Sequence, residues 1–137
     1  MKHKALFSAA LMGLSATAAH AAEPVTGRWL TEGGAAIVSI KPCGQNLCGA
    51  IERVVKPTPG GPTTDAKNPN PALRNRPYVG ITILSGFTNN GDDWRGQIYD
   101  PKSGKTYRSI IKAAGNTLDV KGCIAVFCRS QTWTRVR

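Results

Sequence analysis

Residues 114–121 read AGNTLDVK and place a tight turn directly before an alternating strand. Gly115 and Asn116 tolerate positive φ, which suits the turn of a β-hairpin. Over residues 117–121 polar and apolar side chains alternate, so that one face of the strand meets a core and the other meets water. The stretch therefore predicts an antiparallel hairpin with half-buried strands.

The same pattern continues outward in both directions. Short alternating runs separated by turn residues predict eight strands, at residues 26–31, 35–41, 47–55, 79–87, 94–99, 105–113, 117–124 and 129–136. Eight short strands with hairpin connections and no long helical pattern predict an all-β antiparallel fold. A small eight-stranded barrel is favoured over a sandwich because so short a chain has few elements to cover free sheet edges. Such a barrel is either filled by side chains or holds one small ligand.

One long segment interrupts the strands. Residues 56–77 hold six of the nine prolines and separate the third predicted strand from the fourth. Asn70 is placed to cap a short helix that has Pro71 at its first position. A connection of this length in a compact barrel is uncommon and often functional. We expect a Pro-rich loop with a short helix that forms a lid across one barrel mouth.

The N-terminus has the features of a secretory signal peptide. Lys2 and Lys4 precede an apolar run over residues 5–19, and Ala19-His20-Ala21 is a small-x-small cleavage site. The apolar run is too short to span a bilayer, so we expect a protein that does not span the membrane. Cleavage after Ala21 would leave residues 22–137 as a single barrel domain, located in the periplasm or secreted.

The composition narrows the classes of function. The chain has 18 Lys and Arg against 8 Asp and Glu, a net charge of +10, which falls to +8 when Lys2 and Lys4 leave with the signal peptide. Both histidines, His3 and His20, leave as well, which excludes Ser-His-Asp and Cys-His catalysis and His-ligated zinc. We therefore predict no enzyme and no cofactor; the remaining catalytic alternative is a carboxylate-based or Ser/Lys-based hydrolase. Export argues against a nucleic-acid partner.

The four cysteines, Cys43, Cys48, Cys123 and Cys128, show the spacing C-x4-C twice. An even number of cysteines in an exported chain favours disulfides. The simplest pairing is Cys43 with Cys48 and Cys123 with Cys128, and the alternative is a cross-pairing between the two regions. A four-thiolate metal site is disfavoured, because structural zinc favours two-residue spacing and thiolates rarely stay reduced outside the cytoplasm. We predict no metal.

Two terminal motifs resemble the lipocalin and calycin signature. They are Gly27-Arg28-Trp29 on the first predicted strand and Thr132-Trp133-Thr134-Arg135 on the last. The resemblance implies that Trp29 packs at the closed end of the barrel beneath Arg135. We therefore interpret Trp29, Trp133 and Arg135 as structural residues, with contact between Arg135 and a ligand as the alternative.

The whole chain closely resembles the bacterial family catalogued as domain of unknown function number 2147, over residues 25–136. The motifs that carry this resemblance are Cys43-Gly44-x-x-Leu47-Cys48-Gly49, Asp65-x-x-Asn68-Pro69, Leu73-Arg74-x-Arg76-Pro77, Val79-Gly80, Trp94-x-Gly96-x-Ile98-Tyr99-Asp100-Pro101, Gly104-Lys105-x-Tyr107 and Gln131-Thr132-Trp133-Thr134-Arg135. The resemblance implies an exported protein with a lipocalin-like barrel and no settled biochemical activity. It also implies that the second cysteine pair is a feature of only part of the family.

The candidate site residues lie in the long segment and on the strands beyond it. Asp65, Asn68, Arg74 and Arg76 are able to grip a carboxylate, phosphate or sulfate head group while an acyl or aromatic tail enters the barrel. The alternative is that they pair with one another and with carbonyls to hold the loop on the barrel. The aromatic candidates for the cavity wall are Trp94, Tyr99 and Tyr107, with ordinary cross-strand packing as the alternative.

Two hypotheses of function follow from the sequence. The first is a periplasmic protein that binds a small amphipathic or anionic ligand in the barrel or at its mouth. The second is a basic envelope-interaction module with a filled barrel, whose surface meets lipopolysaccharide, phospholipid or an acidic protein partner.

Overall fold

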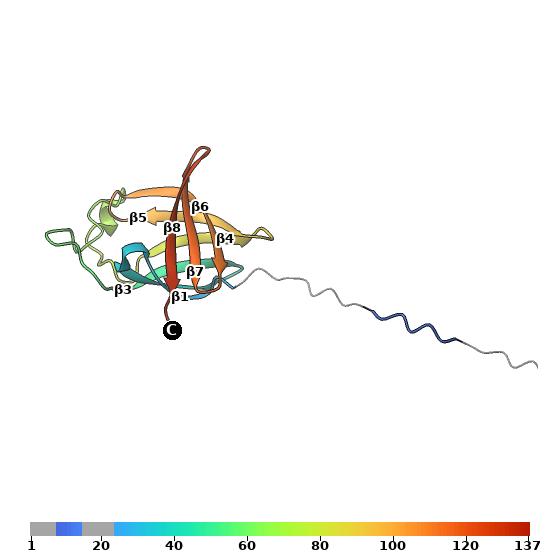
Figure 1. Cartoon of the computed structure of the whole chain (residues 1–137). Coiled ribbons are helices and arrows are strands. Elements are labelled where there is room, and N and C mark those ends of the chain that lie inside the picture. The colour runs from blue at the N-terminus through green and yellow to red at the C-terminus, as the bar shows by residue number, and fades with distance from the viewer. Residues whose placement is uncertain (1–7, 15–23) are drawn as a thin grey trace, which may run out of the picture.

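The fold rests on a computed structural model, which describes residues 8–14 and 24–137 (Figure 1). The expected cleavage site after Ala21 lies outside these residues. Within the described ranges, no helix has both the length and the apolar character needed to cross a membrane.

The strands close into one barrel in which each strand pairs antiparallel with the next and the last returns to the first. The elements in chain order are β1 (Gly27–Leu30), η1 (Glu32–Gly34), β2 (Ala36–Cys43), β3 (Asn46–Val54), η2 (Pro71–Leu73), β4 (Thr82–Asn89), β5 (Trp94–Asp100), β6 (Lys105–Ala114), β7 (Thr117–Ile124) and β8 (Phe127–Arg135). The predicted eight-stranded antiparallel barrel is confirmed, and η2 with its Asn70 cap is the short helix expected in the Pro-rich segment.

Two strands start two or more residues away from their predicted first residue. β4 begins at Thr82 instead of residue 79, because Gly80 has a φ of +94° and the Ile81 amide donates to the Tyr78 carbonyl in a turn. β8 begins at Phe127 instead of residue 129, because Phe127 pairs directly with Ile124 across a two-residue turn. Both differences reflect turns that the side-chain alternation alone does not reveal.

The barrel has two unlike ends. The connections β2–β3, β4–β5 and β6–β7 meet at one end, together with the two chain ends of the barrel. We call this the closed end. The connections β1–β2, β3–β4, β5–β6 and β7–β8 meet at the other, which we call the open end, and this end holds the Pro-rich loop of residues 56–77 (Figure 1).

Trp29 seals the closed end of the barrel. Its ring is fully buried, and its Nε1 donates to the Val25 carbonyl oxygen at 2.8 Å. The guanidinium carbon of Arg135 lies 4.1 Å from the ring centroid, and the same guanidinium donates to the carbonyls of Thr26 and Pro24. This is the arrangement that the two terminal motifs predict, and a buried cation–π stack of this kind stabilises by about 0.5–2 kcal/mol.

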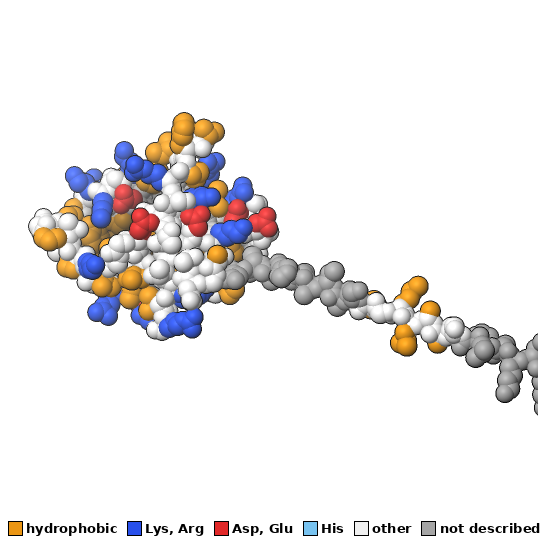
Figure 2. Space-filling view, viewed as in Figure 1, with side chains coloured by type: hydrophobic (Ala, Val, Ile, Leu, Met, Phe, Trp, Pro, Cys, Tyr) orange, Lys and Arg blue, Asp and Glu red, His pale blue; other side chains and the backbone are white. Residues whose placement is uncertain are grey.

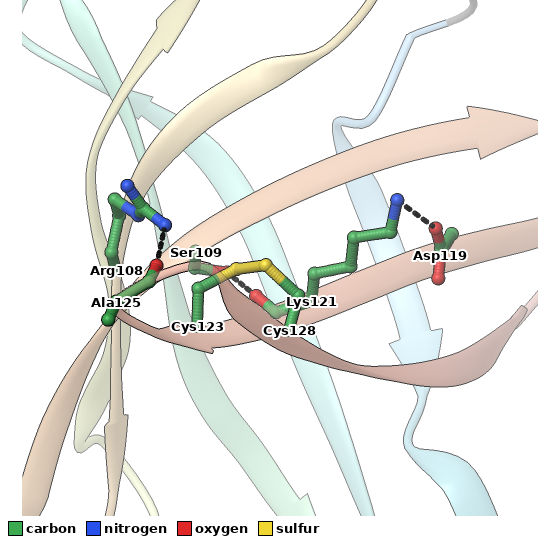
Figure 3. Close-up of a disulfide and its surroundings, with 7 residues drawn as sticks. All are labelled: Arg108, Ser109, Asp119, Lys121, Cys123, Ala125 and Cys128. Atoms are coloured by element: carbon green, nitrogen blue, oxygen red, sulfur yellow. Dashed lines mark hydrogen bonds and ion pairs between the residues drawn. A yellow bond between two sulfur atoms is a disulfide. The ribbon is translucent and has the colours of Figure 1, made fainter.

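Each end of the barrel carries one disulfide. Cys43–Cys48 closes the β2–β3 hairpin at the closed end, and Cys123–Cys128 joins β7 to β8 at the open end (Figure 3). The local pairing is thus confirmed, and the cross-pairing alternative is wrong. The sulfurs of all four cysteines, which lie in the described part of the chain, are consumed in these bonds.

Candidate functional site

A cavity of about 1220 Å³ lies at the open end of the barrel. Its inner wall is apolar and is formed by side chains of β3, β4, β5, β7 and β8, namely Ile51, Ile83, Ile98, Val120 and Trp133. Ligand cavities in proteins span roughly 300–1,000 Å³, so this one has room for a small amphipathic molecule. The open end of the barrel is therefore hollow, whereas buried core side chains pack the rest of the interior.

Cationic side chains surround the mouth of this cavity. Lys56, Lys67, Lys102 and Arg129 all belong to its lining, and all four residues are exposed. None of them forms an ion pair with an acidic group in the part of the chain that the structure describes. An incoming anion would therefore not have to displace a carboxylate from these cations.

The two acidic residues of the lining are engaged locally. Glu32 Oε2 accepts from the Thr132 amide at 2.7 Å, which ties η1 to β8. The Asp100 carboxylate accepts from the Lys102 amide and the Ser103 hydroxyl, both at 2.9 Å, within the β5–β6 turn. Four cations against two hydrogen-bonded carboxylates leave the mouth positively charged.

Asp65 holds the Pro-rich loop against the barrel. It is fully buried and accepts three hydrogen bonds, from Tyr99 Oη at 2.5 Å, Asn68 Nδ2 at 2.8 Å and Arg76 Nε at 2.9 Å. Tyr99 belongs to β5, whereas the other three residues belong to the loop. A buried carboxylate satisfied by three donors is a strong tether.

The electrostatics of this cluster follow from its burial and its donors. Burial alone would raise the pKa of Asp65, but hydrogen bonds from Tyr99, Asn68 and Arg76 and the charge of Arg76 lower it overall below the usual 3.8. The cluster therefore keeps Asp65 ionised. Burial and the hydrogen bond to Asp65 raise the pKa of Tyr99 to about 12, so Tyr99 keeps its proton and remains the donor. Burial and the charges of Asp65 and Asp100 raise the pKa of Tyr78 as well.

Further bonds order the loop around η2. Arg74 Nε donates to the Asn68 carbonyl at 2.8 Å, and Asn68 Oδ1 accepts from the Asn70 amide at 2.8 Å. Asn70 Oδ1 in turn accepts from the Ala72 amide at 3.0 Å and caps η2. These contacts satisfy the polar groups of a segment that lacks strand partners.

The loop also packs closely on the β5–β6 turn. Gly104 has a φ of +71°, and a Cβ at this position would run into the backbone of Lys67. Only glycine permits both the conformation and the close approach. This contact brings the Lys67 segment and the Lys102 turn together at one side of the cavity mouth.

The structure places the sequence-predicted residues in three different surroundings. Tyr99 and Tyr107 belong to the cavity wall, as does Trp133, which we had interpreted as structural. Asp65, Asn68, Arg74 and Arg76 come together within the loop but are not part of the lining. Trp94 starts β5 near the closed end and packs against the core there.

Sequence reasoning missed the cations of the mouth, Lys56, Lys67, Lys102 and Arg129. A signal for them was present. In an antiparallel barrel every second connection lies at the same end, so residues just after the third and fifth strands and at the start of the eighth must be neighbours. The position of Lys67, by contrast, depends on how the Pro-rich loop folds back.

A closed eight-stranded antiparallel barrel with a ligand-sized cavity at one end defines a lipocalin-like protein. The structure is similar to that described as "Protein HP1028 from the human pathogen Helicobacter pylori belongs to the lipocalin family", with a TM-score of 0.72 and 23% sequence identity over 83% of this chain and 84% of that one. Residues 27–135 match the family described as "Uncharacterized protein conserved in bacteria (DUF2147)", and the chain belongs to this family. No curated protein shows a significant match to the chain.

Proposed function

We propose that this protein binds a small amphipathic molecule with an anionic head group, with the tail in the barrel cavity and the head group at the cationic mouth. The observation that carries the proposal is the combination of an apolar cavity of about 1220 Å³ with four cations at its mouth that have no acidic partner among the described residues. No catalytic step is part of the proposal.

The apolar wall supplies the affinity for a tail. Ile51, Ile83 and Ile98 reach the cavity from three adjacent strands, and Trp133 faces it from β8. Each methylene group that moves from water into such a wall contributes about 0.8 kcal/mol. The wall does not select a head group, because an apolar surface discriminates little between polar ends.

The mouth supplies the selection for charge. Lys67 and Lys102 lie on two segments that the Gly104 contact holds together, so both side chains lie at the same side of the cavity mouth. A carboxylate or phosphate placed there gains charge-assisted hydrogen bonds from both. We also propose that binding takes place after export and removal of residues 1–21, a setting in which both disulfides are stable.

The proposal is tested by calorimetry with probes that share one tail. The protein is produced from the full-length sequence in bacteria and recovered from the periplasmic extract without denaturation, and its intact mass reports whether residues 1–21 were removed. We expect dodecanoate to bind and dodecyltrimethylammonium to bind at least tenfold more weakly. Native mass spectrometry before and after organic extraction of the same sample reports any ligand acquired in the cell.

Two variants separate the roles of cavity and mouth. Gly122 belongs to the cavity lining, and a Cβ there makes only ordinary contacts with Ile98 and Tyr107, so Gly122→Leu should narrow the cavity and weaken dodecanoate binding without unfolding the protein. Lys67→Gln/Lys102→Gln should weaken dodecanoate binding by roughly threefold to tenfold and leave the binding of dodecanol unchanged.

The matched control for charge is Lys41→Gln/Lys112→Gln. Both residues are exposed, and neither belongs to the cavity lining. This variant changes the net charge equally and should bind dodecanoate as the parent does. Equal losses in both double variants, or undiminished binding in Gly122→Leu, would contradict the proposed site.

A further inference from the structure

The β7–β8 hairpin ends in an apolar tip of four residues, Ile124, Ala125, Val126 and Phe127, which we call the hairpin tip. The side chains of Ile124, Val126 and Phe127 are 65%, 86% and 79% exposed. Figure 2 shows this tip projecting from the barrel as a group of apolar side chains with cationic side chains on either side. Polar residues and glycine dominate ordinary exposed turns, so an apolar tip indicates a contact surface.

The hairpin tip is held in a fixed conformation. Cys123 and Cys128 lie directly opposite each other and form the disulfide at its base (Figure 3). Arg108 Nη2 on β6 donates to the Ala125 carbonyl at 2.6 Å, and Ala125 itself has a φ of +52°. The turn has a non-glycine residue in this uncommon conformation, and the disulfide and Arg108 restrain it. The apolar side chains of the tip are therefore held exposed in one arrangement.

The remaining exposed apolar side chains lie at the same end of the barrel. Among residues 24–137, the large apolar residues classed as exposed are Val55, Leu73, Val79 and the three of the hairpin tip. Val55 follows β3, and Leu73 and Val79 belong to the β3–β4 connection, so all six lie at the open end. The closed end has none within this range.

The exposed charges beside the hairpin tip at the open end are cationic. Arg108 and Arg129 flank the hairpin tip on β6 and β8, are exposed, and have no acidic partner in the described part of the chain. The acidic residues at this end, Asp65, Glu32 and Asp100, are buried or accept local hydrogen bonds. Apolar side chains next to unpaired cations complement the interface of an anionic bilayer, where acyl chains lie beneath phosphates.

We propose that the open end docks on a bilayer that contains anionic phospholipids, with the hairpin tip inserted between head groups and Arg108 and Arg129 bound to phosphates. Ile124 and Phe127 also belong to the cavity lining, so docking places the cavity mouth against the bilayer. This goes beyond the binding of a small ligand and holds whether or not the cavity is occupied.

Vesicle co-sedimentation tests the proposal. The protein recovered from bacteria that express the full chain, with its N-terminus established by intact mass, is mixed with vesicles of phosphatidylglycerol and phosphatidylcholine or of phosphatidylcholine alone. We expect binding to the anionic vesicles that weakens as salt is raised, because screening reduces the attraction of exposed charges. Val126→Asn should lower the partition coefficient roughly tenfold, since Val126 would lose its burial in the bilayer.

Val126 is not part of the cavity lining, so its replacement leaves the proposed ligand site intact. The matched control is Val136→Asn, the same replacement next to the closed end, which should bind vesicles as the parent does. Val126→Trp should bind more tightly and gain emission that brominated acyl chains quench. Gly122→Leu, which narrows the cavity, should leave vesicle binding unchanged, so a failure of the cavity proposal is distinguishable from a failure of this one.

Three results would overturn the docking proposal. The first is no binding to anionic vesicles at low salt, and the second is binding that Val126→Asn leaves unchanged. The third is a dimer in lipid-free solution that Val126→Asn dissociates, which would assign the hairpin tip to a second copy of the chain.

Discussion

Asp65 shows how a single buried charge fixes the position of a whole loop. Its two carboxylate oxygens take donors from Tyr99 on the barrel and from Asn68 and Arg76 on the loop. Because the carboxylate has no contact with solvent, it depends on all three donors. The Pro-rich segment thereby gains a fixed place beside the cavity mouth without forming strands.

The depressed pKa of Asp65 predicts acid sensitivity. In the unfolded chain the carboxyl titrates near 3.8, and in the folded protein it titrates lower. The stabilisation is therefore fully present above pH ~4 and is lost as the pH falls through the lower, folded value. Urea unfolding between pH 7 and pH 2 should show this loss, and Asp65→Asn should reduce the acid-dependent part.

Asp65→Asn should also lower the free energy of unfolding at pH 7 by about 1.5–3 kcal/mol, because Tyr99, Asn68 and Arg76 lose their charged acceptor. Asp119→Asn is the control, since the Asp119–Lys121 pair is exposed and its atoms are 3.7 Å apart. A loss of similar size in the control would contradict the role given to Asp65.

At the scale of elements, the two disulfide-bonded hairpins have the same cysteine spacing but lie at opposite ends of the barrel. Each bond joins cysteines five positions apart, so each restrains a loop of the same length. The chain-entropy account gives about 2 kcal/mol for either loop. One hairpin lies at the closed end, whereas the other carries the apolar hairpin tip.

We predict that the two disulfides contribute equally to stability and unequally to surface binding. Cys43→Ala/Cys48→Ala and Cys123→Ala/Cys128→Ala should each lower the free energy of unfolding by about 2 kcal/mol in urea titrations. Only the second pair should weaken co-sedimentation with anionic vesicles, because only the second disulfide supports the hairpin tip. If removal of Cys43–Cys48 weakened vesicle binding as much, the effect would be one of general stability.

At the scale of the whole molecule, the barrel is a packed core at one end and a cavity at the other. Ile111 on β6 is fully buried among core side chains, whereas Ile83 on β4 is buried and also forms part of the cavity wall. Truncating a side chain costs most where the space it leaves stays empty inside tight packing.

Ile111→Ala should therefore lower the free energy of unfolding by about 2–5 kcal/mol, as large-to-small core substitutions do. Ile83→Ala should lower the free energy of unfolding clearly less, because it enlarges a space that already exists. It should also raise the affinity for acyl probes longer than dodecanoate relative to that for dodecanoate. Equal destabilisation of the two variants in thermal or urea unfolding would show that the open end is as tightly packed as the closed end.

The sequence determined the strands and their turns and favoured the local disulfides, while the resemblance of its terminal motifs to the lipocalin signature implied the Trp29–Arg135 stack. Alternation, turn chemistry and short cysteine spacing are properties of neighbouring residues, so they can be read without knowing the rest of the fold. The start of β4 and the start of β8 were misplaced because each depends on a turn whose geometry the side chains do not display.

The cavity, its cationic mouth and the hairpin tip were decided only by the tertiary structure. Whether a barrel is filled depends on how side chains from five or more strands meet, and no single segment contains that information. The strand order alone places Lys56, Lys102 and Arg129 at one end, but only the folded barrel and loop show that they and Lys67 line one cavity. The motifs alone identified one group of candidate residues, Asp65, Asn68, Arg74 and Arg76. Only the folded loop shows that these residues form hydrogen bonds with one another and with Tyr99. The reason is that a hydrogen bond depends on the distance between two groups in space, which the order of residues in the chain does not give.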